Sequence, residues 1–365
     1  MVLTRVALGL VAYGAAWFLS PGTEGAPDQG LATVWVHWDA LRFVLIATSG
    51  YDGLGTPPNS TAFFPLYPLT IRALSVVGLD EVVAAMLVSA AGSFVAFAFL
   101  YKLAVRDVAE GEGSENQVAG SRAVLYLALF PTAVFLIAPY SESLFLAGAI
   151  PAFYLAREER WHLVGIPAAV AMGARFAGAF VLLGLAIEFV RQRNYSFDRV
   201  ANGLLSLLIG AIPLLAYGAY LSQTRGDPFY FFTDQRIGWG RQFVGPLQSL
   251  SNTLDRWRDP ALTTDFAVAY RLEVVAAALG LAAVVWALAK REWGYAAFMG
   301  STLVVLTTST EYFSIPRILL TFFPAAVFFA QAGLHRRWLH EALLIVMAPL
   351  AAVGVIVYTQ GAWFF

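Results

Sequence analysis

The sequence contains no cysteine and little charge, since charged residues make up 13% of its 365 positions. The absence of cysteine excludes disulfides, thiolate metal sites and thiol nucleophiles, and it is compatible with any cellular compartment. A soluble domain needs more charge than this to cover its surface, whereas here 59% of the residues are hydrophobic and the mean hydropathy is +0.67. We therefore expect lipid to surround most of the chain.

Several signatures of enzyme chemistry are also missing. The chain has no Asp-x-Asp pair, no GxxxxGKS/T phosphate loop, no HExxH and no GxSxG. Nucleotide-metal, P-loop, zincin and serine-hydrolase chemistry therefore lack their residues. A net charge of -1 produces no overall field that would attract nucleic acid, and we expect no nucleic-acid partner.

Apolar runs long enough to cross a membrane recur along the chain. They lie at about 3–20, 82–104, 120–138, 142–157, 161–190, 201–221, 264–290, 292–309, 316–333 and 338–359. The run 161–190 is too long for one span, and its interruptions predict two short helices that meet at Arg175. The first run, behind Arg5, could also open a signal peptide, but its length and the many later spans favour a retained helix. We predict an all-α polytopic membrane protein with about eleven spans, forming one integral membrane domain over 1–365.

Lysine and arginine in the short loops predict the orientation. With a cytoplasmic N-terminus, the basic loop residues lie inside: Lys102, Arg106, Arg122, Arg157, Arg160, Arg191, Arg193, Arg199, Lys290, Arg291, Arg336 and Arg337. This requires that 21–80 makes no net crossing. Segment 63–79, which carries Pro65 and Pro68, is then re-entrant or interfacial; if it spans, the orientation of everything downstream is reversed. Two long segments, 21–80 and 222–262, are predicted to face the exterior.

The first outer segment contains VWVHWDALRFVLIATSGYDG. Apolar residues recur in it at three- and four-residue intervals: Trp35, Trp38, Leu41, Leu45 and Ile46. This spacing predicts an amphipathic helix on the membrane surface, with Asp39 at the interface. A carboxylate between a lipid-facing aromatic surface and an aqueous cavity suits general-base chemistry. The alternative is an interfacial tryptophan beside a solvated aspartate.

A second carboxylate, Glu142, lies in PYSESLF at the outer junction of two apolar runs. An ionisable group at that depth is costly unless it is paired or hydrated, which makes it a candidate site residue. Alternatively, Ser141 caps the following helix and Glu142 lies in its first turn, where the helix dipole favours an anion.

Two arginines occupy predicted outer ends of spans, Arg175 in GARFAG and Arg317 in EYFSIPRILL. Arginine on the outer face runs against the charge bias, so we expect an anionic partner for each. Phosphate matches guanidinium geometry well, and a helix beginning near Pro316 would add backbone donors. The alternative is a structural ion pair, for example with Glu142 or Glu311.

Two further groups of residues are candidates for the site. The stretch GDPFYFFTDQRIGWGR, residues 226–241, could line a sugar or polyprenyl groove, but ordinary interfacial packing is favoured for each of its residues. The histidines are dispersed, and only His37 among them is predicted to lie outside, next to Asp39.

Together the motifs resemble the PIG-V type polyprenol-phosphate-mannose-dependent mannosyltransferases, as a bacterial member. The matching segments, in order, are HWDALRF…ATSGYDG, AFFPLYPLTIRAL, LALFPTAVFLIAPYSESLFL, REERW, ARFAG, GDPF…WGR and SIPRILLTFFP. The resemblance implies the GT-C glycosyltransferase architecture, with interfacial helices in the first outer loop over a lipid-accessible cavity and an isoprenoid-phosphate sugar as donor.

The resemblance also implies residue roles. Asp39 is implied as the catalytic residue, Arg317, Arg175 and His37 as donor-phosphate ligands, and the following as substrate-binding residues: Trp38, Tyr51, Tyr67, Tyr140 and Glu142. His37 stands where arginine is more usual, and ARFAG lacks a proline after its arginine, which bears on the acceptor and the donor sugar. No metal or other cofactor is expected, because arginine can hold a monophosphate leaving group.

The predicted function is inverting transfer of a hexose, mannose by resemblance, from a polyprenyl-phosphate donor to a hydroxyl of a lipid- or glycan-linked acceptor. Asp39 is the predicted general base. The site is predicted on the extracytoplasmic face of a bacterial cytoplasmic membrane. One alternative is a lipid-linked sugar flippase, which should show repeated halves and midplane ionisable groups that the sequence lacks. The other is a protein O-glycosyltransferase of the same fold.

Overall fold

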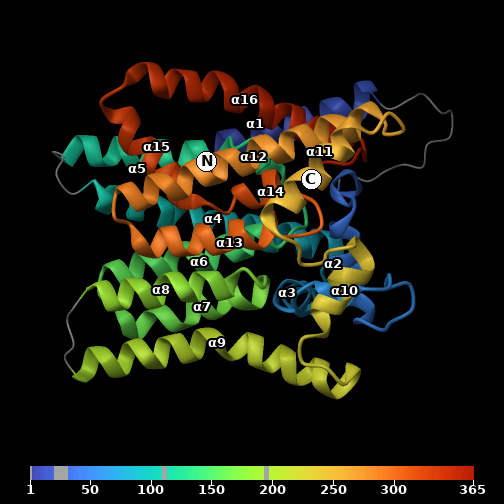
Figure 1. Ribbon diagram of the computed structural model, residues 1–365, viewed down its shortest axis with the longest axis horizontal. Helices are drawn as coiled ribbons and strands as arrows, with labels where there is room; N and C mark the ends of the chain where they lie inside the picture. Colours follow the sequence, from blue (N-terminus) through green and yellow to red (C-terminus); the bar gives the residue numbers. More distant parts are fainter. Residues whose placement is uncertain (1, 20–31, 109–112, 193–196) are drawn as a thin grey trace. The chain divides into compact units, whose positions relative to one another are not determined.

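The computed structural model describes residues 2–19, 32–108, 113–192 and 197–365, and every regular element in these ranges is a helix (Figure 1). The internal contacts divide the chain into two compact units, each assembled from segments distant in sequence. Unit 1 comprises Met1–Gly55, Tyr67–Leu146 and Phe322–Phe364; unit 2 comprises Thr56–Leu66, Ala147–Thr321 and Phe365.

Unit 1 packs α4 against α5 and α15, and α1 against α16. Its helices are α1 Val2–Leu19, η1 Thr33–Trp35, α2 Asp39–Ser49, α3 Leu66–Val76, α4 Glu81–Asp107, α5 Gly113–Ala128, η3 Ala133–Leu136, α15 Phe323–Leu334 and α16 Arg337–Thr359. Helix α6, Glu142–Arg157, begins in unit 1, and the division falls after Leu146.

Unit 2 packs α7 against α9 and α8, and α13 against α8 and α12. Its helices are η2 Ser60–Ala62, α7 Trp161–Ala174, α8 Gly178–Arg191, α9 Phe197–Arg225, α10 Tyr230–Trp239, α11 Pro246–Arg258, α12 Thr264–Ala289, α13 Trp293–Thr307 and α14 Ile315–Leu319. Figure 1 shows α7, α8 and α9 as neighbouring green helices.

Five helices in the described residues are long and apolar enough to cross a membrane: Val2–Leu19, Glu81–Asp107, Phe197–Arg225, Phe266–Ala289 and Arg337–Thr359. Three shorter apolar helices, α7, α13 and α15, accompany them. The prediction of an all-α polytopic membrane protein is therefore confirmed. The expected total of about eleven crossings stays a prediction, because several apolar runs form helices shorter than the roughly 20 residues that one crossing needs.

Proline breaks two runs that were predicted as single spans. The run 120–138 forms α5, which ends at Ala128 before Pro131 and is followed by the short η3. The run 316–333 divides into α14 and α15, with Pro324 in the first turn of α15. A proline lacks an amide donor and disfavours helical geometry at the preceding residue, so it is a frequent point at which a helix ends or begins. The expectation of one continuous helix in each of these two runs is wrong.

The predicted break at Arg175 is confirmed. Helix α7 ends at Ala174 and α8 begins at Gly178, with Arg175 in extended geometry between them. A Cβ on Gly178 would lie 2.2 Å from the Met172 Cα, so this tight turn requires a glycine.

The two α-helices of the segment 21–80, α2 and α3, have 11 residues each. Such a helix is about 16 Å long, too short for a hydrocarbon core of about 30 Å. The predicted apolar stripe is wrong in detail, because α2 begins only at Asp39. Trp35 is buried in η1, whereas Trp38 and Leu41 are 50% and 47% exposed. The buried face of α2 consists of Ala40, Phe43, Ile46 and Ala47.

Candidate active site

Asp39 is the first residue of α2 in unit 1, and it is half-buried. The dipole of a helix favours a negative charge at this end. Trp38, directly before it, has φ 55° and ψ -119°, a conformation that is rare for a bulky residue and typically costs about 1–3 kcal/mol. Its indole N–H donates to the Ala362 carbonyl at 3.3 Å. The chain thus makes a strained turn immediately before the candidate carboxylate.

Two tyrosines hold this turn from distant parts of unit 1. The hydroxyl of Tyr140 donates to the His37 carbonyl at 3.2 Å. The hydroxyl of Tyr358 lies 2.8 Å from the Trp35 carbonyl and 3.4 Å from the His37 carbonyl. Strained backbone persists where its surroundings determine it, and such sites are concentrated at functional positions. These bonds fix the position of Asp39 before any ligand binds.

Tyr67 lies in an aromatic cluster behind α2. Its ring centroid is 4.9 Å from that of Phe43, which in turn lies 6.4 Å from the Tyr140 ring. Tyr67 is fully buried, and its hydroxyl lies 2.8 Å from the Ser89 hydroxyl on α4. Burial raises the pKa of Tyr67, and the nearby Glu142 carboxylate raises it further, so the phenol stays protonated. In this arrangement Tyr67 joins α3 to α4.

Glu142 and Tyr51 lie at helix ends. Glu142 is the first residue of α6 and is fully buried, which confirms its predicted place in the first turn. Tyr51 follows Gly50, the cap of α2, and is half-buried. The whole of α2, about 16 Å, separates Tyr51 from Asp39.

Arg175 belongs to unit 2, where it follows α7 as its half-buried C-cap. Its backbone N–H donates to the Ala171 carbonyl at 3.2 Å. The next residue, Phe176, packs against Phe231 and Phe64 with ring centroids 5.4 and 6.2 Å apart. The turn that carries Arg175 is therefore fixed by an aromatic cluster.

Arg317 lies in the five-residue helix α14 of unit 2 and is 7% exposed. Ser314, before this helix, has a positive φ of 66°. The backbone N–H groups of Ser314 and Ile315 donate to the two carboxylate oxygens of Glu273 at 2.7 and 2.8 Å. The prediction that backbone donors near Pro316 would serve a phosphate is therefore wrong at these two amides, because a carboxylate of the chain already accepts from them.

Glu273 was not identified from the sequence, since it lies 41 residues before Ser314 inside an apolar run. The one signal was its charge, because an ionisable residue within a span marks a structural or functional site. Glu311, the alternative ion-pair partner expected for Arg317, instead pairs with Arg256 at 3.0 Å and accepts from the Tyr270 hydroxyl at 2.8 Å.

The stretch 226–241 packs within unit 2, as favoured from the sequence. Phe231 is 2% exposed, and the Trp239 ring centroid lies 5.6 Å from that of Phe63. Asp234 is buried and accepts hydrogen bonds from the backbone N–H and the hydroxyl of Thr61. These residues therefore attach segment 56–66 to α10.

His37 is half-buried beside Tyr358, with ring centroids 5.6 Å apart. Burial lowers the pKa of His37 below its ordinary value of 6.5, against smaller opposite effects of hydrogen bonds with the backbone of Thr359 and Val34. The imidazole is therefore neutral at pH 7. A neutral imidazole offers one N–H, so His37 can give a phosphate a hydrogen bond but not a full positive charge.

The lowered pKa of His37 predicts a pH dependence of stability. The unfolded chain binds this proton at higher pH than the folded chain, so the contribution is complete above pH 6.5 and is lost as the pH falls through the folded pKa. Thermal unfolding of detergent-solubilised protein should show a smaller loss between about pH 7.5 and pH 5.5 in His37→Asn than in the unmodified chain. His335→Asn, at an exposed position, is the control; equal pH profiles for all three proteins would contradict the prediction.

Apolar membrane-crossing helices define the class of this protein: it is an all-α polytopic membrane protein, and the comparison with protein families makes it a membrane glycosyltransferase. Residues 24–223, more than half of the chain, match the family described as Mannosyltransferase (PIG-V). The chain belongs to this family, and the predicted mannosyltransferase class is confirmed. Comparisons with curated proteins and with solved structures give no match. The matched region contains Asp39, Glu142 and Arg175 and ends before Arg317.

Proposed function

We propose that this mannosyltransferase transfers mannose, with inversion, from a polyprenyl-phosphate donor to a hydroxyl of a lipid- or glycan-linked acceptor. Asp39 acts as the general base. The observation that carries the proposal is the strained turn at Trp38, which the hydroxyls of Tyr140 and Tyr358 support and which ends at Asp39 on the first residue of a helix. A base must be held in position to gain from proximity to its substrate.

The proposed reaction is a single displacement. The acceptor oxygen forms a bond to the anomeric carbon while the bond from that carbon to the phosphate oxygen breaks. The proton of the acceptor hydroxyl passes to the Asp39 carboxylate, and the polyprenyl phosphate leaves with the bonding electron pair. A base of this kind is typically worth about 10²–10⁴-fold in rate.

The remaining candidate residues fall into two groups by exposure. Trp38 is 50% exposed and Tyr51 is half-buried, so both can offer an aromatic face to a sugar ring. The fully buried members, Tyr67, Tyr140 and Glu142, act through the residues that they position. For the donor phosphate we propose Arg317 and Arg175 as cationic ligands and neutral His37 as a hydrogen-bond donor.

We further propose that the reaction needs no metal ion and takes place on the outer face of a bacterial cytoplasmic membrane, with the N-terminus inside. Among the described residues, no three His, Asp or Glu side chains form a group suited to a metal ion. A monophosphate leaving group carries less charge than a nucleotide diphosphate, and arginine can stabilise it. Turnover should persist in excess EDTA; loss that Mg²⁺ or Mn²⁺ restores would contradict this.

The direct test incubates purified protein with a polyprenyl phosphate that carries labelled mannose and with a membrane extract. Label should move to a lipid- or glycan-linked product. Label on protein would instead identify a protein O-mannosyltransferase. If no label is transferred and the labelled lipid instead moves between the leaflets of a vesicle, the protein is a flippase and the proposed reaction is contradicted.

Arg317 provides a test of the phosphate contact. Arg317→Lys keeps the charge but loses the paired N–H groups that match a phosphate. We expect the donor KM to rise about tenfold or more in Arg317→Lys and further in Arg317→Ala, because a charge-assisted hydrogen bond is worth about 1.5–3 kcal/mol. Steady-state kinetics at fixed acceptor measures this. A normal donor KM in a folded variant would contradict the contact.

A further inference from the structure

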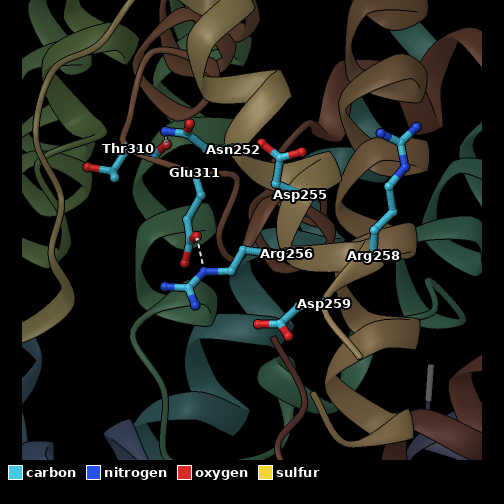
Figure 2. A pocket seen from close by; sticks show the side chains of 7 residues that line it. All are labelled: Asn252, Asp255, Arg256, Arg258, Asp259, Thr310 and Glu311. Atoms are coloured by element: carbon cyan, nitrogen blue, oxygen red, sulfur yellow. Dashed lines mark hydrogen bonds and ion pairs between the residues drawn. The ribbon is translucent and has the colours of Figure 1, made fainter. Parts of the chain in front are cut away.

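An open pocket of about 480 Å³ lies in unit 2 around the ion pair of Arg256 with Glu311 (Figure 2). One wall is α11 with the residue that follows it, from Asn252 to Asp259; the other is the connection between α13 and α14, at Thr310 and Glu311. Its volume lies within the range of small-molecule sites, about 300–1,000 Å³. Helix α11 belongs to the segment 222–262 that the charge pattern predicts on the outer face.

Direct bonds join the two walls. The Asn252 side-chain amide donates to the Thr310 carbonyl at 2.6 Å, and Arg256 Nε donates to Glu311 Oε2 at 3.0 Å. Figure 2 shows the Arg256–Glu311 pair between Asp255 and Asp259. Because these bonds are made without a ligand, the cavity is formed in advance.

Hydrogen-bonding capacity remains in the cavity. Asp255 and Arg258 are exposed, and in the described part of the chain neither side chain forms a hydrogen bond or an ion pair. Arg256 uses its Nε to bond Glu311, and the N–H groups of its two terminal nitrogens remain available as hydrogen-bond donors in the pocket. The cavity thus offers acceptors and donors side by side.

The lining discriminates among ligand classes. Every residue that lines the pocket is polar or charged, so a lipid tail finds no apolar side chain to pack against. Three carboxylates face two guanidinium groups, which disfavours an anion such as phosphate. A metal ion is disfavoured because both Glu311 oxygens already accept from Arg256 and Tyr270, and one Asp259 oxygen accepts from the Ala261 N–H. A neutral polyol, whose hydroxyls both donate and accept, matches this lining.

We propose that this cavity binds the neutral, polyhydroxylated headgroup of the glycan-linked acceptor. The assignment of the glycan to the acceptor rests on the proposed function; the binding of a neutral glycan does not. Asp255 accepts from sugar hydroxyls, and Arg256 and Arg258 donate to sugar oxygens.

The test uses full-length protein in detergent or nanodiscs, with neutral manno-oligosaccharides of two to four residues as probe and inorganic phosphate as a second probe. Titration calorimetry should show saturable oligosaccharide binding that phosphate does not displace. Asp255→Ala with Arg258→Ala should weaken it about tenfold or more, since hydrogen bonds to charged groups are lost. Asp198→Ala with Arg336→Ala, which removes one exposed charge of each sign elsewhere, should leave it unchanged.

A transfer assay with a membrane extract separates this inference from the proposed function. In the double variant Asp255→Ala, Arg258→Ala, the acceptor KM should be about tenfold higher and the donor KM unchanged. No oligosaccharide binding, or equal binding by this variant, would overturn the cavity assignment even if transfer is normal. Oligosaccharide binding by a protein that transfers no mannose would overturn the proposed reaction and leave the glycan site standing. Displacement by phosphate would identify an anion site instead.

Discussion

Asp39→Asn should reduce mannose transfer about 10²–10⁴-fold, the usual contribution of a general base. The substitution replaces a carboxylate by an amide of nearly the same shape, so the half-buried position stays filled. An amide cannot take the acceptor proton at neutral pH. The Tyr140 and Tyr358 hydroxyls donate to backbone carbonyls of residues before Asp39, and Asp39→Asn leaves those carbonyls unchanged, so the turn should be retained.

The measurement is single-turnover transfer of labelled mannose at saturating donor, with the unfolding temperature measured on the same preparation. Asp198→Asn, an exposed carboxylate in α9, controls for the loss of one negative charge. Turnover within a few-fold of the unmodified protein in a folded Asp39→Asn preparation would remove Asp39 from the chemistry, whereas a lowered unfolding temperature would point to a structural role.

Gly148→Ala should destabilise unit 2 by about 1–3 kcal/mol, the usual cost of overpacking. A Cβ at this position of α6 would lie 2.4 Å from the Ala171 backbone N and 2.5 Å from the Pro167 carbonyl oxygen of α7. Both are backbone atoms, so relief requires a shift of a helix rather than a rotation of a side chain. Small residues at such crossings let membrane helices approach closely.

Gly9→Ala in α1 is the matched control, because nothing lies within 4 Å of its added Cβ. Alanine is the better helix former by about 1 kcal/mol, so this variant should unfold at the same or a higher temperature. Thermal unfolding of both variants in the same detergent measures the contrast. Equal unfolding temperatures would show that α6 and α7 separate without cost.

The backbone N–H groups before Pro316 were expected to be available to a phosphate, but they donate to Glu273. Local sequence patterns could not predict this partner. Pro316 and Arg317 are adjacent in sequence, and the helix start there could be predicted from the proline. Which anion accepts from the preceding amides depends on α12, whose Glu273 lies 41 residues earlier. A span carrying one carboxylate does not indicate which of its neighbours that carboxylate will face.

The sequence by itself determined the membrane class, the break at Arg175 and the place of Glu142 in the first turn of α6. These follow from hydropathy, proline, glycine and charge, which act within a few residues. Only the tertiary structure decided that Trp38 is strained, that Tyr358 supports the turn before Asp39, and that α11 lines an open pocket together with Asp259, Thr310 and Glu311. Those features depend on contacts between segments up to some three hundred residues apart. The helices are alike in hydropathy, so side-chain shape and hydrogen bonding decide which of them pack together.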